Sequence, residues 1–176
     1  IDSPDWFNFT ILGDYDPPEW VREQVFYQIF PDRFANGDPS NDILAGVDSP
    51  MGKPTQVREW GEIPKPFMET MTVEFYGGDL QRITQNLYYM VDLGVTAIYI
   101  CPIFDAETNH FYDIKDYHNV ARHLGGNEAL QELREAMTDR NMKLILDITP
   151  NHLGFRHHWF LDALDNPESE ANEYFY

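Results

Sequence analysis

The chain has 176 residues, of which 43% are hydrophobic, 24% are charged and one is a cysteine. This composition is close to that of globular domains, and a single cysteine excludes an internal disulfide framework. The sequence contains no apolar run near the roughly 18 residues that a membrane span needs. Thirty acidic and twelve basic residues give a formal net charge of −18, which argues against nucleic-acid and membrane partners because their phosphates are repelled.

Residues 1–18 combine several prolines, including Pro17 and Pro18, with mixed polar and aromatic residues. This composition is typical of a linker or an irregular segment, so we assign 1–18 to no domain. The chain begins at Ile1 rather than at a methionine and ends on an aromatic stretch at Tyr176. We therefore expect it to be a piece of a longer protein, and nothing in it indicates a cellular compartment.

Three short apolar runs, each followed closely by a proline, predict buried strands at residues 25–30, 95–101 and 143–148. The stretches 36–78 and 102–126 lack periodicity and predict two long loops, of the length that is often functional. Three strands cannot close a barrel. If the fold is a β/α barrel, the chain therefore holds about its first third.

Two helices are predicted between these strands. The first has apolar residues at helical spacing from Leu80 to Met90, with Asp79 as its N-cap and Gly94 as its C-terminal glycine. The second has one apolar face from Leu130 to Met137, with Asn127 as its N-cap. Because strands and helices alternate, the sequence predicts an α/β fold with parallel strands.

The segment from Asn36 to Asp42 gathers Asn and Asp side chains in a turn that also holds glycine and proline. Oxygen ligands of this kind suit Ca²⁺, although the spacing does not fit an EF-hand. The same residues also suit a solvated turn in which Asn and Asp side chains bond their own backbone. The spacing alone leaves both interpretations open.

Asp147, Asn151 and His152 follow the third predicted strand, at the end where β/α barrels place their active sites. Taken alone, Asp147 suits an acid, a base, a metal ligand or a helix cap, and His152 suits a ligand or a packed side chain. No G-x-S-x-G motif supports nucleophilic serine chemistry. Aromatic residues supply 15% of the chain, which suits either core packing or stacking against sugar rings.

Four stretches together resemble the α-amylase family of glycoside hydrolases, especially its cyclomaltodextrinase, neopullulanase and maltogenic-amylase branch. They are residues 25–38, 75–80, 112–117 and 147–152. The resemblance implies that residues 19–153 hold the first three β/α units of a (β/α)₈ TIM barrel. It also implies that residues 154–176 begin the small domain B, which is inserted after the third strand.

The resemblance also implies roles for individual residues. Tyr112 and His152 would bind the sugar next to the scissile bond, while Asp147 and Asn151 would brace the site. A Ca²⁺ ion would be bound by a set from both ends of the first long loop: Asn36, Asp38, Asn41, Asp42, Gly77 and Asp79. Two residues depart from the family pattern. Thr149 stands where the family usually has valine, and Cys101 stands where asparagine or threonine is common.

The implied reaction is hydrolysis of α-glucosidic bonds in α-glucans, maltooligosaccharides or cyclodextrins, with retention of configuration. Retaining enzymes use two carboxyl groups about 5–5.5 Å apart, and in the family these come from later strands, so no catalytic residue is expected in this chain. We expect the fragment alone to be inactive. Its expected protein partners are the remainder of its own chain or a second copy in a homodimer. The alternative function is a calcium-dependent carbohydrate-binding module without turnover.

Overall fold

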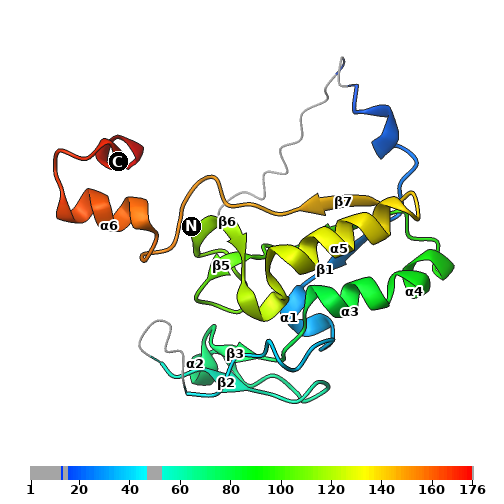
Figure 1. Ribbon diagram of the computed structural model, residues 1–176, viewed down its shortest axis with the longest axis horizontal. Coiled ribbons are helices and arrows are strands. Elements are labelled where there is room, and N and C mark those ends of the chain that lie inside the picture. The colour runs from blue at the N-terminus through cyan, green and yellow to red at the C-terminus, as the bar shows by residue number, and fades with distance from the viewer. Residues whose placement is uncertain (1–12, 14–15, 47–52, 176) are drawn as a thin grey trace, which may run out of the picture.

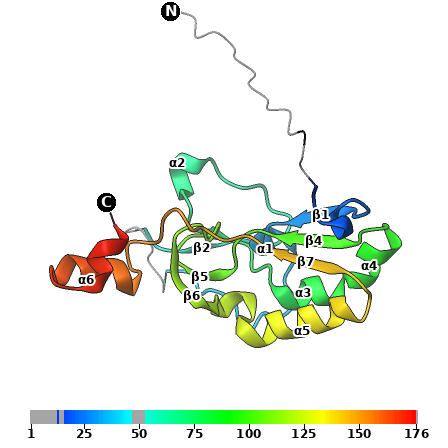
Figure 2. The same ribbon diagram turned by 90° about the horizontal axis from the view of Figure 1, so that it is seen from above.

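The computed structural model describes residues 13, 16–46 and 53–175, so most of the predicted linker 1–18 lies outside the described residues. Its centre is a parallel three-stranded sheet in the order β1-β4-β7 (Figure 2). The strands are β1 (Phe26–Ile29), β4 (Ala97–Ile100) and β7 (Lys143–Leu146). Ile29 pairs with Ile100, and Ile100 with Leu146, so the three strands end at one edge. The predicted α/β fold with parallel strands is confirmed.

Helices cover one face of this sheet (Figure 2). They are α3 (Leu80–Gln85), α4 (Leu87–Asp92) and α5 (Gly126–Thr138), with the short α1 (Pro31–Phe34) after the first strand. Ile83, Leu87 and Leu133 are fully buried in one core with Ile98 and Ile100 of the central strand. Phe26, in the outer strand β1, remains 45% exposed. Only the central strand, β4, is therefore buried as completely as its sequence predicts.

The two helix predictions had different outcomes. Asp79 caps α3 as predicted, because its carboxylate accepts the Arg82 N–H at 2.7 Å, although the helix is interrupted at Asn86. The predicted cap at Asn127 is wrong. The N-cap of α5 lies two residues earlier, at a left-handed Gly125. The Asn127 side chain instead accepts the Val120 N–H at 2.8 Å, which fixes the end of the preceding strand.

Both predicted long loops contain regular structure, which corrects that prediction. The first holds β2 (Gln56–Val57), α2 (Phe67–Thr70) and β3 (Glu74–Phe75), with β2 and β3 paired in parallel. The second holds an antiparallel pair, β5 (Phe104–Ala106) and β6 (Ile114–Val120), with shifts in register. Two-residue strands and an irregular hairpin leave no periodic pattern that a sequence can show.

Residues 36–78, the first of these two segments, are called the first excursion. This segment returns to the place where it began. The Gly78 N–H donates to the Asp32 carbonyl at 3.0 Å, and the Asp79 N–H donates to the Ala35 carbonyl at 3.2 Å. A Cβ atom at Gly78 would lie 2.1 Å from the Pro31 carbonyl oxygen, so the two backbones meet where no side chain fits. Both ends of the excursion are thus fixed to α1.

After β7 the chain leaves the sheet and forms α6 (His158–Asp165) and η4 (Glu170–Tyr174), which pack on each other (Figure 1). Short 3₁₀ turns, η1 (Glu19–Val21) and η3 (Arg122–Leu124), complete the described elements. The division into a barrel part and domain B at residues 153 and 154 stays a prediction. Among the described residues, each helix is too short or too polar to cross a bilayer.

Candidate functional site

Asp147 lies where β7 ends. The Tyr112 hydroxyl donates to its carboxylate at 2.7 Å, and the Tyr99 hydroxyl, from the central strand, also lowers the pKa of this carboxylate. Burial raises the pKa of Asp147, but the hydrogen bonds from Tyr99, Tyr112 and the Ile148 N–H outweigh burial, and the net pKa is lowered. Asp147 therefore stays ionised and accepts the Tyr112 hydroxyl.

The same hydrogen bonds keep both tyrosines protonated. The pKa of Tyr112 is raised, first by its bond to Asp147 and then by burial. The same two causes raise the pKa of Tyr99 to about 12. Because the Tyr112 hydroxyl is a donor to the Asp147 carboxylate, the Tyr112 ring is held in one orientation at the carboxyl end of the strands.

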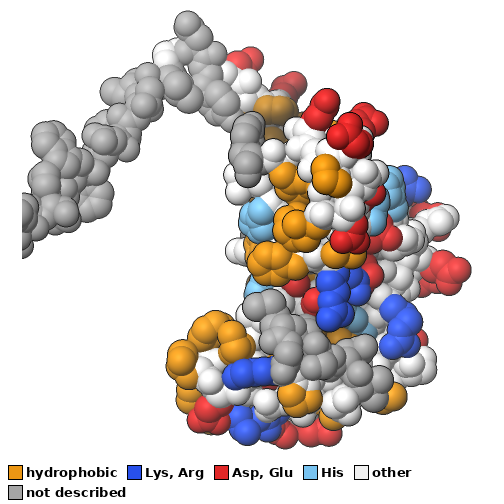
Figure 3. All heavy atoms as spheres, turned by 90° about the vertical axis from the view of Figure 1, so that its left-hand side faces the viewer, with side chains coloured by type: hydrophobic (Ala, Val, Ile, Leu, Met, Phe, Trp, Pro, Cys, Tyr) orange, Lys and Arg blue, Asp and Glu red, His pale blue; other side chains and the backbone are white. Residues whose placement is uncertain are grey.

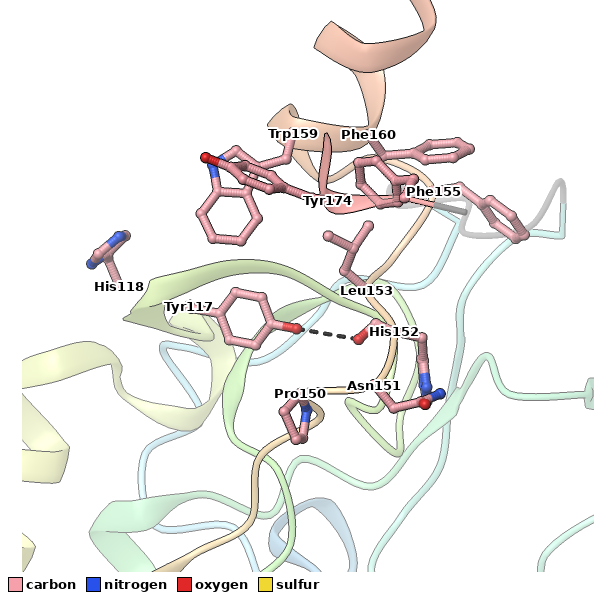
Figure 4. A pocket seen from close by; sticks show the side chains of 11 residues that line it. Tyr117, His118, Pro150, Asn151, His152, Leu153, Phe155, Trp159, Phe160 and Tyr174 are labelled. Carbon is pink, nitrogen blue, oxygen red and sulfur yellow. Dashed lines mark hydrogen bonds between the residues drawn. The ribbon is translucent and has the colours of Figure 1, made fainter. Parts of the chain in front are cut away.

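Tyr112 and His152 line one pocket of 490 Å³. Tyr112 comes from the β5–β6 connection and is half-buried, whereas His152 is exposed on the loop after β7. The His152 carbonyl accepts the Tyr117 hydroxyl at 3.2 Å, which ties that loop to β6 (Figure 4). The structure thus brings together the two residues for which the resemblance implies sugar contacts.

Asn151 faces a different environment. It is exposed, and among the described residues its side chain forms no hydrogen bond. With His152 it lines a larger pocket of 850 Å³, and the aromatic rings of Trp159, Phe160 and Tyr174 gather across from Tyr117 (Figure 4). Asp147 contacts Tyr112, whereas Asn151 does not, and the bracing role of both residues stays a prediction.

The Asn36–Asp42 turn meets the far end of the first excursion. The Asn36 amide nitrogen lies 2.8 Å from both carboxylate oxygens of Asp42. Gly77, at a positive φ of 72°, lies so close that a Cβ there would be 2.7 Å from the Asn36 amide nitrogen and 2.9 Å from an Asp42 oxygen. Gly77 therefore converges with two predicted ligands, Asn36 and Asp42, that lie 35 to 41 positions earlier in the chain.

The chemistry of this cluster fits a hard cation. The Asn36 amide oxygen and both polar atoms of the Asn41 side chain are buried without a hydrogen-bond partner among the described residues, and such orphaned groups are costly unless something binds them. Burial raises the pKa of Asp42, as do the charges of Asp79 and Asp38, while the Asn36 hydrogen bond lowers it. A bound cation would satisfy the oxygens and offset the clustered negative charge.

Two of the predicted ligands are engaged elsewhere. The Asp79 carboxylate accepts the N–H groups of Gly37, Asp38 and Arg82, and the Asp38 carboxylate accepts both the N–H and the hydroxyl of Ser40. Within the described ranges, no three His, Cys, Asp or Glu side chains converge as a metal site. The candidate set therefore depends on amide and carbonyl oxygens as much as on carboxylates.

Comparison with known proteins places the chain in a family. Residues 28–176 match the model of the α-amylase catalytic domain. The chain belongs to the α-amylase family. It is 40% identical over 169 residues to a cyclomaltodextrinase from Geobacillus thermopakistaniensis, covering 94% of this chain and 26% of that protein.

Other relatives agree. A neopullulanase 2 from Thermoactinomyces vulgaris is 37% identical, with 92% of this chain and 25% of that protein covered. Among solved structures, the type III pullulan hydrolase from Thermococcus kodakarensis matches with a TM-score of 0.80 and 36% identity, over 89% of this chain and 28% of that chain. The chain thus spans about a quarter of the length of these α-amylase-family relatives, and the predicted resemblance is confirmed.

Other carboxylates of this α-amylase-family chain are engaged in local structure. Asp113 accepts the Thr108 hydroxyl and the Glu107 N–H, and Asp116 accepts the His118 N–H at 2.7 Å and the Asn119 amide. These bonds fix the β5–β6 hairpin.

Sequence reasoning missed Tyr99 and Tyr117, both of which hold site loops. Tyr99 lies in a strand predicted to be wholly buried, and a buried tyrosine hydroxyl requires a partner. Since parallel strands end at one edge, the carboxylate after β7 was the available acceptor. Tyr117 gave no such signal, because its hairpin was not predicted.

Proposed function

We propose that the longer protein containing this chain is a retaining glycoside hydrolase that acts on α-glucosidic bonds of α-glucans, maltooligosaccharides or cyclodextrins. The observation that carries the proposal is the Tyr112–Asp147 hydrogen bond at the carboxyl edge of the sheet, beside the pocket that Tyr112 shares with His152. The relatives are named cyclomaltodextrinase, neopullulanase and pullulan hydrolase, which supports this substrate class.

In this proposal β1, β4 and β7 are the first three strands of the (β/α)₈ barrel, and the exposed edges of the sheet are where further strands pair. The C-terminal ends of the barrel strands then surround the active site. Residues 154–176 begin domain B, whose aromatic side chains line the larger pocket.

The residues of this chain bind and orient the sugar. The Tyr112 ring stacks on the sugar at the cleavage point, because sugar C–H faces suit aromatic rings. Asp147, ionised and bonded to the Tyr112 hydroxyl, keeps that ring in place. His152, exposed at the rim, hydrogen-bonds the hydroxyl groups of the same sugar. The nucleophile and the acid come from strands outside this chain.

Calcium completes the proposed site. Its oxygen ligands are those of Asn36, Asn41, Asp42 and the Gly77 carbonyl, of which the amide oxygens of Asn36 and Asn41 have no other partner among the described residues. Asp38 and Asp79 add negative charge. The ion neutralises that charge and supplies a link between the two ends of the first excursion, where a closed loop of about forty residues is entropically costly. Its role is structural, because α2 and β3 then stay in place beside Tyr112.

The test is hydrolysis of β-cyclodextrin, maltoheptaose and pullulan by the full-length protein, with the anomer released from maltoheptaose followed by proton NMR. We expect cleavage with retention of the α-configuration. Binding of these sugars without any cleavage would favour the carbohydrate-binding module instead. A product of inverted configuration would contradict the double-displacement mechanism.

A further inference from the structure

The pocket that holds Tyr112 and His152 has a wall from the first excursion. Phe67 of α2, together with Met71 and Thr72, lines the same 490 Å³ space. This volume is in the usual range of ligand pockets, roughly 300–1,000 Å³, and exceeds that of a single hexose ring. The pocket therefore has room for more than the sugar that Tyr112 would contact.

Phe67 is an unusual wall residue because it is 60% exposed. Its neighbours Ile63 and Met68 are more exposed, at 88% and 83%, and hydrophobic side chains project from this part of the surface, over α2 (Figure 3). Of these three, only Phe67 lines the pocket. The fold gains little from a phenyl ring that it leaves mostly in water.

The wall is fixed relative to Tyr112. The Asn109 N–H donates to the Thr72 carbonyl at 2.9 Å, and the buried Asn109 side chain donates to the Glu74 carbonyl at 2.8 Å. Asn109 precedes Tyr112 by three positions in the same connection. The segment after α2 and the loop that carries Tyr112 are therefore joined by two hydrogen bonds.

The backbone on both sides of the pocket is strained. Met71, which ends α2, has a φ of 51°, and Phe111, which directly precedes Tyr112, has a φ of 60°. Such conformations cost non-glycine residues about 1–3 kcal/mol and persist only where surrounding contacts enforce them, often at ligand-binding sites. Pro66 at the N-cap of α2 restricts the segment further.

We infer that Phe67 is a sugar-contacting residue that binds α-glucan units beyond the one at Tyr112, and that it favours longer or cyclic substrates. The inference rests on the proposed function. An exposed aromatic ring offers the apolar face that a glucose ring prefers, and Glu107, His110 and Lys115 in the same pocket can hydrogen-bond glucan hydroxyls. Phe67 thus affects the preference for substrate length and takes no part in the chemical step.

The test compares two substrates in the full-length protein carrying Phe67→Ala. One is maltoheptaose, which reaches beyond Tyr112, and the other is p-nitrophenyl α-glucoside, which has a single sugar unit. We expect kcat/KM for maltoheptaose to fall about fivefold to tenfold, mainly through KM, while the value for the glucoside changes less than about twofold. Phe67→Tyr should retain the preference, and Met68→Ala, which changes the same helix away from the pocket, is the matched control.

The measurement distinguishes failure of the proposed function from failure of the role inferred for Phe67. A wild-type protein that cleaves neither substrate refutes the proposed function and the inference with it. An active wild type whose Phe67→Ala variant keeps the wild-type ratio of the two kcat/KM values overturns the inference alone. Equal losses on both substrates also overturn it, because they indicate a general disturbance of the site.

Discussion

His123 makes the stability of the protein depend on pH in a direction that the structure defines. Its ring lies between Phe111, stacked at 5.3 Å, and Phe75, edge-on at 5.5 Å, and its Nε2 atom is buried without a partner among the described residues. Burial lowers the pKa of His123 from 6.5 to about 4, and the charges of Arg122 and Lys115 act in the same direction.

The sign follows from proton binding. Between pH 6.5 and about 4 the unfolded chain binds a proton at His123 and the folded chain does not, so stability is fully present above 6.5 and is lost as pH falls. At about 1.4 kcal/mol for each pH unit, the full difference corresponds to about 3 kcal/mol. Roughly 2 kcal/mol of this should be lost between pH 7.5 and pH 5.

The perturbation is His123→Phe, which keeps an aromatic ring between Phe75 and Phe111 and removes the titrating group. Denaturant unfolding of the full-length protein, followed by tryptophan fluorescence at pH 7.5 and pH 5, should show a loss smaller by about 2 kcal/mol in the variant than in the wild type. His123→Leu should behave alike, and the exposed His118→Gln should follow the wild type. Equal losses in the wild type and both His123 variants would refute the reasoning.

The remaining predictions concern the proposed site and the chain itself. Chelation by EDTA should lower the melting temperature by several degrees, because a ligand at 100 times its Kd stabilises by about 2.7 kcal/mol; an unchanged melting temperature with no calcium in elemental analysis would sink the calcium proposal. Tyr112→Ala should lower kcat/KM on maltooligosaccharides about tenfold or more, since a stacking contact contributes about 1–2 kcal/mol, and Tyr112→Phe should cost less; wild-type kinetics in Tyr112→Ala would exclude the stacking role. The isolated chain should show no glycosidase activity and should aggregate, because its sheet has two open edges; a monodisperse monomer with a cooperative melt, or measurable hydrolysis of maltotriose, would contradict one half of this expectation each.

The sequence predicted well what depends on repeated patterns. Three apolar runs ended by prolines gave β1, β4 and β7, and the Asp79 cap and Gly94 located the first helix. It failed where a single long-range contact decides the structure. Asn127 has the chemistry of a cap, but the Val120 N–H of the preceding strand takes its side-chain oxygen, and Gly125 begins the helix instead.

The candidate site divides in the same way. Tyr112, Asp147 and His152 followed from motifs, and the structure brings the first two into contact and places His152 in the same pocket as Tyr112. Phe67 gave no signal, because α2 has four residues and no periodicity of its own. Its place in the pocket depends on Asn109, whose partners at Thr72 and Glu74 are about 35 positions away and could not be inferred from either segment alone.

Because both ends of the first excursion are fixed, its length can change without moving the rest of the fold. Contacts at Gly78 and Asp79 hold the return point on α1 whatever lies between, and loop-closure entropy grows only slowly with added residues, by about 0.6 kcal/mol for each doubling. Insertions or deletions in the middle of the excursion can therefore reshape the wall around Phe67 while the sheet, Asp147 and Tyr112 keep their positions. If the proposed sites are correct, substrate preference can accordingly diverge through this segment with no change in Tyr112, Asp147 and His152, the residues proposed to orient the sugar.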